Sequence, residues 1–472
     1  MTTAASTESV EDAVESVVAR VRAGFASGLT RPLAWRRTQL EALDRMLVEN
    51  GAAIEKAIHL DLGKHGLETF ITESGTVRTE IKHALKNLDR WTKPRAVRAG
   101  LAMFPSKARI QREPLGTVLI VSPWNYPVHL LLMPLVGAIA AGNAVVLKPS
   151  ELAPATSALM AEVLPTYLDE RAVAVVEGAV EETTALLALP WDHIFYTGNG
   201  TVGRIVATAA ARHLTPVTLE LGGKSPVWVD PSADVDAAAH WLAWGKLLNT
   251  GQTCVAPDYV MTTAEVAPRL VEALGREITA LYGTDIRNNP DYGRIVNQRH
   301  LDRLVGLLDG ATVAFGGEHD RDDRYLAPTV LTDVTPASPA MQEEIFGPVL
   351  PVMVVAGHDA AIDHVNAGDK PLAMYLFARA GEVVDAFLAR TSSGGVAVNA
   401  NLIQIGVPAL PFGGVGASGY GAYHGEASVR AFSHERSVLI KGRGPNLMRF
   451  AEPPFTDKKN KMLRGKSADT QS

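Results

Sequence analysis

Hydrophobic residues near the start of the chain recur every three or four positions, which is the period of an amphipathic helix. This pattern predicts helices over 9–26, over 32–59 with Gly51 interrupting, and over 68–91. The period is lost over 93–114, where the chain becomes irregular and basic. Because this stretch lacks regularly interleaved aromatic residues for stacking on bases, a solvated extended segment is favoured over a nucleic-acid-binding arm.

Short β-branched runs alternate with helical segments from Gly116 onward. The ranges that predict strands are 117–121, 144–148, 172–176, 193–196 and 216–220, and those that predict helices are 130–141, 156–164 and 202–212. Alternating buried strands and helices predict a parallel sheet with helices on both faces.

The alternation resumes after 222–226 and continues to about Arg390. Strands are predicted at 227–229 and 259–261, with a helix through Trp241 and Trp244 between them. This pattern predicts a second α/β domain. The ranges 394–399 and 408–425 are rich in turns, and the basic tail after Lys441 is predicted to be extended or disordered.

Composition narrows the class of protein. The 472 residues carry a net charge of −6, so no overall basic field attracts nucleic acid. A single cysteine excludes an intramolecular disulfide and a thiolate-rich metal cluster, and the 13 histidines are scattered without metal-ligand spacing. The first ten residues lack the features of a signal peptide, and no apolar run is long enough to span a bilayer. We therefore expect a soluble cytoplasmic protein without a metal.

Polar and glycine-rich loops follow several of the predicted strands. They occupy 123–127, 148–151 and 198–203, and Glu220 ends a strand in the same way. Open parallel sheets bind ligands beyond the carboxyl ends of their strands. These loops are therefore expected to share one site.

The range 198–203 matches the dinucleotide-binding pattern G-x-G-x-x-G between a strand and a helix, and Glu220 follows about twenty residues later. Taken alone, this pattern assigns the pyrophosphate to the glycines and the ribose to Glu220. A second match at 414–419 follows no predicted strand. Since the chain has 41 glycines, such matches arise readily by chance.

Three further loop features each have a functional and a structural interpretation. Lys148 and Glu151 could bind ribose hydroxyls, or Ser150 between them could simply cap a helix. Because Asn125 lies between two prolines, its side-chain amide could be fixed as a donor toward an oxyanion, although a turn-stabilising role is favoured on sequence alone. The acidic pair Glu343 and Glu344 precedes a Gly-Pro turn and is typical of an exposed surface.

Cys254 is the only cysteine and lies in the segment 248–257. Free cysteine often behaves as a small buried hydrophobic residue, and that interpretation remains open. However, the flanking Gly251, Gln252 and Pro257 are typical of a turn rather than of a helix core. A thiol in such a turn could lie in a cleft where its pKa is tuned.

The segments 210–230, 251–259 and 411–425, in this order, resemble the aldehyde dehydrogenase superfamily, and most of all its class 3 branch for fatty and aromatic aldehydes. The resemblance extends from about Arg31 to Lys441. It implies that Cys254 is the nucleophile and that the Asn125 side chain and the Cys254 backbone N–H form the oxyanion hole. It also implies that Glu220 is the general base and not a ribose ligand.

The resemblance further implies a binding site for NAD or NADP. In that site Gly198 and Gly203 lie under the pyrophosphate, with a G-x4-G spacing in which Gly200 is incidental. The residues that it implies for cofactor binding are Trp124, Lys148, Glu151, Gly198, Asn199, Gly203, Glu344 and Phe346. Asn199 stands where the family often has serine.

The fold class implied is α/β, with a Rossmann-like NAD(P)-binding domain, a second α/β catalytic domain and a small β oligomerisation element. The expected boundaries are 1–97 and 117–221 for the first domain, 222–395 for the second, 98–116 and 396–441 for the oligomerisation segments, and 442–472 for the tail. We expect a homodimer in which the range 107–112 and the region after Gly394 pair as strands across the subunit boundary.

The implied reaction is NAD(P)-dependent oxidation of an aldehyde to the acid through a thiohemiacetal and a thioester on Cys254. The expected substrate is a medium- or long-chain aliphatic or an aromatic aldehyde. A CoA-acylating relative is an alternative, although it does not need Glu220. A catalytically silent dinucleotide-binding protein on the same fold is a third hypothesis.

Overall fold

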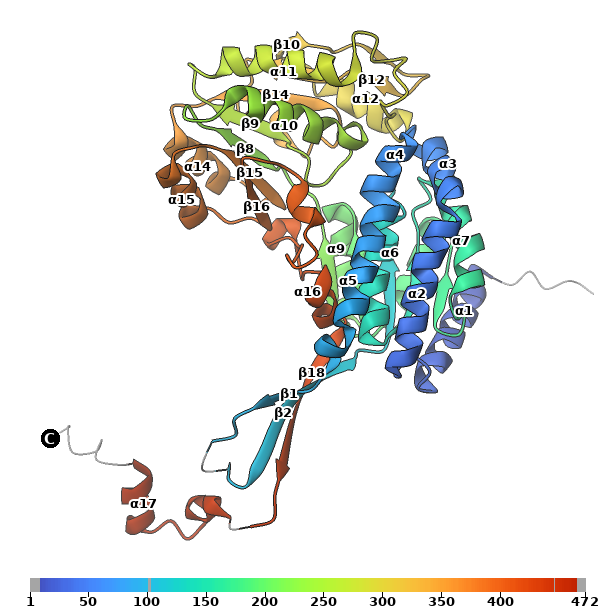
Figure 1. The fold of residues 1–472 in the computed structure, drawn as a ribbon, viewed down its shortest axis with the longest axis vertical. Coiled ribbons are helices and arrows are strands. Elements are labelled where there is room, and N and C mark those ends of the chain that lie inside the picture. Colours follow the sequence, from blue (N-terminus) through green and yellow to red (C-terminus); the bar gives the residue numbers. More distant parts are fainter. Residues whose placement is uncertain (1–8, 101–102, 445, 465–472) are drawn as a thin grey trace, which may run out of the picture.

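The computed structural model describes residues 9–100, 103–444 and 446–464. Two α/β lobes lie side by side, and a narrow three-stranded arm projects away from both (Figure 1). The expected α/β fold class is confirmed. In the described ranges no helix is both long enough and apolar enough to cross a bilayer.

The first lobe is built on a six-stranded sheet of order β17-β7-β6-β3-β4-β5. Its strands are β3 (Thr117–Val121), β4 (Ala144–Lys148), β5 (Val173–Val175), β6 (His193–Thr197), β7 (Val217–Glu220) and the short β17 (Gly419–Tyr420). All neighbours are parallel except β17, which runs antiparallel to β7. The chain order reverses beside β3, so the ligand crevice of this sheet is expected there.

Helices cover both faces of this sheet because its strands are buried on both sides. Val118 and Ile120 belong to one core cluster, whereas Leu119 and Val121 belong to another, as the two-residue period of a strand requires. The helices are α1 (Val10–Ala26), α2 (Leu33–Glu49), α3 (Gly51–Leu62), α4 (Gly66–Thr69), α5 (Gly75–Thr92), α6 (His129–Ala141), α7 (Pro154–Tyr167), α8 (Val180–Ala188) and α9 (Gly200–Ala211). Only α8 was not predicted, because it buries little more than Leu186 and Leu187.

The second lobe contains a seven-stranded sheet of order β10-β13-β14-β9-β8-β15-β16. The strands are β8 (Pro226–Val229), β9 (Tyr259–Thr262), β10 (Thr312–Phe315), β13 (Thr329–Thr332), β14 (Val349–Val354), β15 (Ala373–Phe377) and β16 (Gly395–Val398); β11 (His319–Asp320) and β12 (Tyr325–Leu326) form a separate hairpin. The helices are α10 (Val235–Leu247), α11 (Ala267–Tyr282), α12 (Gln298–Gly306), α13 (Pro339–Gln342), α14 (His358–Ala367) and α15 (Gly381–Arg390). Two expected domain boundaries differ from this sheet arrangement: the cut after 395 falls inside β16, and β17 joins the first lobe.

The arm consists of β1 (Arg95–Val97), β2 (Ser106–Pro114) and β18 (Ser433–Lys441), which follows α16 (Gly425–Ala431). Strands β2 and β18 pair antiparallel from Ser106 opposite Lys441 to Pro114 opposite Ser433. Strand β2, which contains 107–112, pairs with β18 within one chain. The expected pairing of strands across a subunit boundary stays a prediction. Their long matched register satisfies the backbone groups that β2 and β18 turn toward each other, whereas the outer edge of β18 has no strand beside it within the described residues.

The tail also differs from its prediction, because two of its segments are helical rather than extended. They are a 3₁₀ turn (Leu447–Ala451) and α17 (Asp457–Arg464). The Thr456 hydroxyl accepts from the Lys459 N–H at 3.4 Å, and Asp457 lies in the first turn, so the N-terminus of α17 is capped by side chains. The remaining tail, 465–472, lies outside the described residues.

Candidate active site

The loop after β3 and the cysteine loop of the second lobe meet at the boundary between the lobes. The Asn125 amide donates to the Gln252 carbonyl at 3.0 Å, and the Asn249 amide donates to the Asn125 carbonyl at 2.7 Å. The Tyr126 hydroxyl lies 2.6 Å from Thr253 Oγ1. The sequence indicated Asn125 and Cys254 as candidate site residues separately. These bonds hold their two loops together.

The cysteine loop turns sharply before it reaches the thiol. Asn249, Thr250 and Gly251 all have left-handed backbone conformations, with φ of 53°, 55° and 74°. Such a conformation costs a non-glycine residue about 1–3 kcal/mol, so the surrounding contacts must hold it. At Gly251 a Cβ would lie 2.2 Å from the Gly347 carbonyl oxygen, which excludes a side chain there. Cys254 follows in a turn and is only partly exposed, as the flanking residues predicted.

Burial, together with the nearby carboxyl groups of Glu344 and Glu220, raises the pKa of the Cys254 thiol to about 12. The backbone N–H groups of Cys254 and Val255 act in the opposite direction. Cys254 is therefore a protonated thiol in this state, and its sulfur faces backbone donors. A thiol of this kind needs a change in its surroundings before it becomes a nucleophile.

Glu220 ends β7 and is 2% exposed. Neither of its carboxyl oxygens has a hydrogen-bond partner within the described residues. Burial raises the pKa of Glu220 well above its ordinary value, because the charged form loses its hydration. An unpartnered buried carboxyl group is costly, and general bases are found among such groups.

The glycines of the loop after β6 differ in what they exclude. A Cβ at Gly198 would lie 2.3 Å from the Tyr196 hydroxyl, and one at Gly203 would lie 2.8 Å from Leu221 Cδ2. At Gly200 the nearest atom would be 3.4 Å away, at the end of a flexible arginine. The steric demand for glycine therefore follows the G-x4-G spacing and not the dinucleotide pattern G-x-G-x-x-G. Asn199 caps α9 by accepting from the Val202 N–H at 2.9 Å.

The second G-x-G-x-x-G match is explained by local geometry. Gly416 and Gly419 have φ of 66° and 129°, and a Cβ at Gly414 would lie 2.1 Å from the Ser418 carbonyl oxygen. These residues form the 3₁₀ turn (Gly416–Ser418) that leads into β17. The glycines at 414–419 therefore serve a tight turn.

Lys148 and Glu151 lie together after β4. The buried Lys148 ammonium donates to the Pro149 carbonyl at 2.8 Å and contacts Glu151 at 3.4 Å. Burial lowers the pKa of Lys148, and Glu151 opposes this shift. Ser150 Oγ accepts from the Leu152 N–H at 3.2 Å within a turn. The capping interpretation is wrong, because α7 begins at Pro154 after Ala153 and has no side-chain cap.

The two acids before the Gly-Pro turn have different environments. Glu343 is exposed and pairs with Arg303 at 3.0 Å, as expected for a surface residue. Glu344 instead turns toward Gly222, where an added Cβ would lie 2.1 Å from its Oε2. Burial and the nearby Asp258 raise the pKa of Glu344 to about 8. Its Oε1 lacks a partner within the described residues.

Two aromatic side chains complete this side of the site. The rings of Trp124 and Phe346 meet edge to face at 5.5 Å, and the Trp124 ring also contacts His300 at 5.4 Å. Phe346 has φ of 52°, which is an outlier for a bulky residue. The loop carrying Glu344 and Phe346 is therefore held in a specific shape.

Two charged residues that hold this loop were missed by the sequence reasoning. Lys224 pairs with Asp258 and donates to the Glu343 carbonyl at 2.8 Å, and Asp258 accepts from the Ile345 N–H at 2.9 Å. Each lies inside a recognised segment, but no spacing rule links positions so far apart in the chain.

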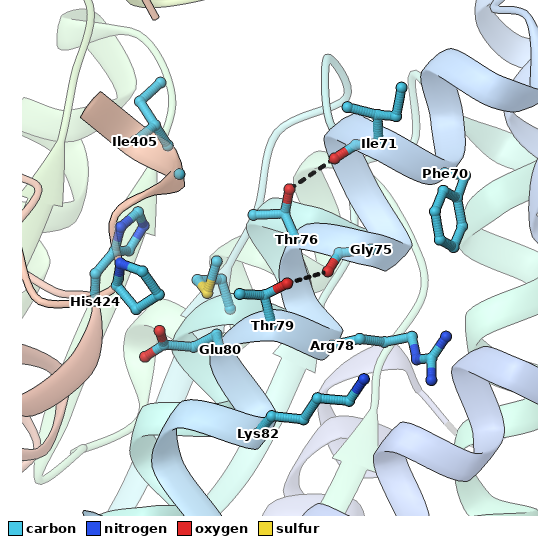
Figure 2. Close-up of a pocket in the computed structure, with 13 residues that line it drawn as sticks. Phe70, Ile71, Gly75, Thr76, Arg78, Thr79, Glu80, Lys82, Ile405 and His424 are labelled. Carbon is cyan, nitrogen blue, oxygen red and sulfur yellow. Dashed lines mark hydrogen bonds between the residues drawn. The ribbon is translucent and has the colours of Figure 1, made fainter. Parts of the chain in front are cut away.

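A cavity of about 350 Å³ lies between α5 and the loops around Ile405 and His424 (Figure 2). Thr76 and Thr79 on α5 and the buried Glu80 face it from one side, and Ile405 and His424 face it from the other. The rings of Tyr423 and His424 are 4.5 Å apart. Burial raises the pKa of Tyr423, and the nearby Glu220 and Cys254 act in the same direction. The cavity is thus adjacent to the wall of the thiol site.

Comparisons with known proteins agree with this geometry. The model of the aldehyde dehydrogenase family matches residues 2–438. The chain is 49% identical over 447 residues to mouse aldehyde dehydrogenase family 3 member A2, covering 94% of this chain and 92% of that protein. It is 49% identical over 428 residues to the mouse dimeric NADP-preferring aldehyde dehydrogenase, covering 91% and 94%.

The fold of this chain is also similar to that of a solved structure. A substrate-bound AldH of Staphylococcus aureus superposes with a TM-score of 0.92 at 42% identity, covering 96% of this chain and 98% of that chain. The chain belongs to the aldehyde dehydrogenase family, near its family 3 members, and is an enzyme that oxidises aldehydes with NAD or NADP.

Proposed function

We propose that Cys254 attacks the aldehyde and that Asn125 and the Cys254 N–H stabilise the resulting alkoxide. The observation that carries this proposal is the bonding of the Asn125 loop to the Cys254 loop across the lobe boundary. The thiol gives its proton to water, its sulfur bonds to the carbonyl carbon, and the π electrons of the carbonyl pass to oxygen, which becomes the alkoxide of a thiohemiacetal. Each donor aimed at such an oxygen contributes about 10²–10³ in rate.

The residues implied for the cofactor fit a dinucleotide. Gly198 and Gly203 leave space where a side chain would fill the turn, and Lys148 and Glu151 offer a cation and a carboxylate for ribose hydroxyls. Glu344, with its unpartnered oxygen, would accept from the second ribose, with Trp124 and Phe346 beside it. The bound NAD⁺ or NADP⁺ supplies the acceptor for the hydride that leaves the thiohemiacetal carbon. Asn199 would contribute through its cap of α9.

Glu220 is proposed to deprotonate the water that hydrolyses the thioester. In that step water oxygen bonds to the acyl carbon, the carbon–sulfur bond breaks, and Glu220 takes the proton. The raised pKa of this buried carboxyl group supports the assignment, since a base with an ordinary pKa would be too weak near neutral pH. The free acid is then the product.

The CoA-acylating alternative predicts strict dependence on a thiol acceptor. We expect the enzyme to produce acid from aldehyde and NAD⁺ without CoA, and chromatography of the acid measures this. A requirement for CoA would reject the hydrolytic proposal. If Cys254→Ala kept the full measured activity, that activity would not depend on the thiol. This outcome would instead favour the catalytically silent dinucleotide-binding protein.

The substrate is proposed to be a medium- or long-chain aliphatic or an aromatic aldehyde. The cavity beside the thiol site supports this, because Ile71, Met133 and Ile405 supply apolar walls next to the threonines of α5. A panel of aliphatic and aromatic aldehydes should therefore show kcat/KM rising with apolar size. A preference for the smallest aldehydes would reject this substrate class.

Both cofactors are proposed to bind. Glu151 would repel the 2′-phosphate of NADP, whereas Lys148 would attract it. The mouse relative is named as NADP-preferring, and Glu151→Gln should shift this chain in the same direction. The ratio of kcat/KM for the two cofactors measures this shift.

A homodimer in the cytoplasm is proposed as the working form. The mouse relative is named as dimeric, and the arm of this chain exposes Leu439 and Ile440 on β18. We further propose that the first lobe binds the cofactor, that the second carries the nucleophile, and that the arm forms the subunit contact.

A further inference from the structure

A fully buried ion pair lies behind the loop that carries Asn125. Lys64 Nζ and Glu73 Oε1 are 2.8 Å apart, and their side chains are 1% and 0% exposed. The other oxygen of Glu73 accepts from the N–H groups of Val128 and His129 at 2.9 and 3.2 Å. Removing two charges from water costs several kcal/mol per ion, so a pair at this place is weak evidence for stability alone.

The helix that carries Glu73 is locally widened. A single π-helical turn (Phe70–Ser74) separates α4 from α5, and the Gly75 N–H donates to the Phe70 carbonyl. Glu68 in α4 and Glu73 in the π-turn both point inward: Glu68 accepts from the Asn249 N–H at 2.7 Å, and Glu73 is fully buried. Such turns occur frequently at functional sites.

Tyr126 links this ion pair to the cysteine loop. The Lys64 ammonium lies 4.3 Å from the centre of the Tyr126 ring, in cation–π contact. The Tyr126 hydroxyl bonds to Thr253 Oγ1 at 2.6 Å, and Thr253 Oγ1 donates to the Leu248 carbonyl at 3.4 Å. Tyr126 follows Asn125 directly, and Thr253 precedes Cys254 directly. One bond therefore connects the neighbours of both proposed oxyanion donors.

We propose that Tyr126 is a positioning residue for the oxyanion hole, because its bond to Thr253 fixes the Asn125 amide and the Cys254 N–H relative to each other. This inference rests on the proposed function of those two groups. The two donors come from different lobes, so their alignment is set by contacts across the boundary and not by either fold alone. A misplacement of 1 Å can cost about 10²-fold in rate, so a loosened Tyr126 contact is measurable.

The test compares Tyr126→Phe with a matched variant, Tyr292→Phe. Tyr292 is also buried, and its hydroxyl donates to the Leu326 carbonyl at 2.8 Å in the second lobe. The readout is the rapid burst of NADH after mixing enzyme and NAD⁺ with the aldehyde that wild type turns over fastest. We expect Tyr126→Phe to slow the burst by about tenfold to a hundredfold with an unchanged KM for NAD⁺. Tyr292→Phe should leave the burst unchanged.

A double-variant experiment separates positioning from a direct contact with the substrate. Asn125→Ala alone should slow the burst by about 10²–10³-fold. If Tyr126 aligns the two donors, its loss should add little, less than about threefold, once one donor has been removed. Equal slowing by Tyr126→Phe in both backgrounds would overturn the proposal.

Thr253 provides a second variant pair that keeps the fold comparable. Thr253→Ser retains the hydroxyl and should keep the burst rate, whereas Thr253→Val should match Tyr126→Phe. A slow burst in Thr253→Ser, or a fast one in Thr253→Val, would reject the bond as the cause. Failure of the underlying function has a different signature, since Asn125→Ala itself would then leave the burst unchanged.

Discussion

At the scale of single residues, the site is defined by acidic groups whose pKa values burial has moved. Glu220 and Glu344 both have raised pKa values, and the thiol of Cys254 does as well. Two neighbouring carboxyl groups and a thiol cannot all ionise cheaply in a buried space. Burial therefore favours the uncharged forms in the resting state, and Cys254 and Glu220 must each lose a proton before they act as nucleophile and as base.

Glu220 gives a prediction for stability as a function of pH. Its folded pKa is raised above its unfolded value, so folding favours the protonated form and stability falls as pH rises between the two values. Glu220→Gln should therefore raise the stability near pH 8 by about 1–3 kcal/mol and have little effect near pH 4. Thermal melts across this pH range measure the difference. A stabilisation that is equal at both pH values would contradict the burial argument.

At the scale of elements, the loop after β6 shows how sequence patterns and steric space can disagree. The sequence pattern favours Gly198, Gly200 and Gly203, whereas added Cβ atoms would clash only at Gly198 and Gly203. The family resemblance indicated the wider spacing, and the steric positions agree with it. Steric space and backbone conformation likewise explain the glycines at 414–419 as parts of a tight turn.

The glycines therefore give a matched set of variants. Gly203 lies near the start of α9, and Gly203→Ala would place a Cβ 2.8 Å from the Leu221 side chain. This variant should raise the KM for the cofactor and lower the free energy of unfolding by about 1–3 kcal/mol. In Gly200→Ala the added Cβ meets nothing closer than 3.4 Å. This variant should leave the KM for the cofactor unchanged and either leave the free energy of unfolding unchanged or raise it by up to about 1 kcal/mol. Cofactor titration and urea unfolding measure the two effects. Equal damage from both variants would contradict the G-x4-G assignment.

How far the sequence predicted these elements depended on the strength of local periodicity. The buried strands of the first lobe, such as β3 and β4, were predicted because all their residues are buried and, apart from Lys148 at the end of β4, apolar or small. The bonds of Asn249 to Glu68 and of Tyr126 to Thr253 were not predicted, because they join residues from different lobes. Cys254 and Glu220 were identified by resemblance and not by any single motif. The helical tail was missed because its composition resembles that of disordered chains.

At the scale of the whole molecule, the arm has no core of its own. Strand β18 pairs with β2 on one edge, and its residues Leu439 and Ile440 are 56% and 51% exposed. Exposed apolar residues on an edge strand invite pairing with another chain. A dimer contact at the arm would cover them.

Leu439→Glu tests this contact. A charge on the proposed interface should convert the dimer into a monomer at micromolar concentration, as measured by light scattering, because an unpaired charge is costly to bury. The matched variant Val313→Glu, at an exposed position of β10 in the second lobe, should leave the dimer intact. A wild-type chain that is monomeric under these conditions would contradict the dimer.

The central claim is that aldehyde oxidation passes through a thioester on Cys254 that Glu220 helps to hydrolyse. The most direct measurement is the intact mass of Glu220→Gln after mixing with NAD⁺ and aldehyde. We predict one NADH released per chain and a mass increase equal to one acyl group, which is lost in Cys254→Ser. Turnover of Glu220→Gln at the wild-type rate, or an acyl adduct that persists without Cys254, would contradict the mechanism.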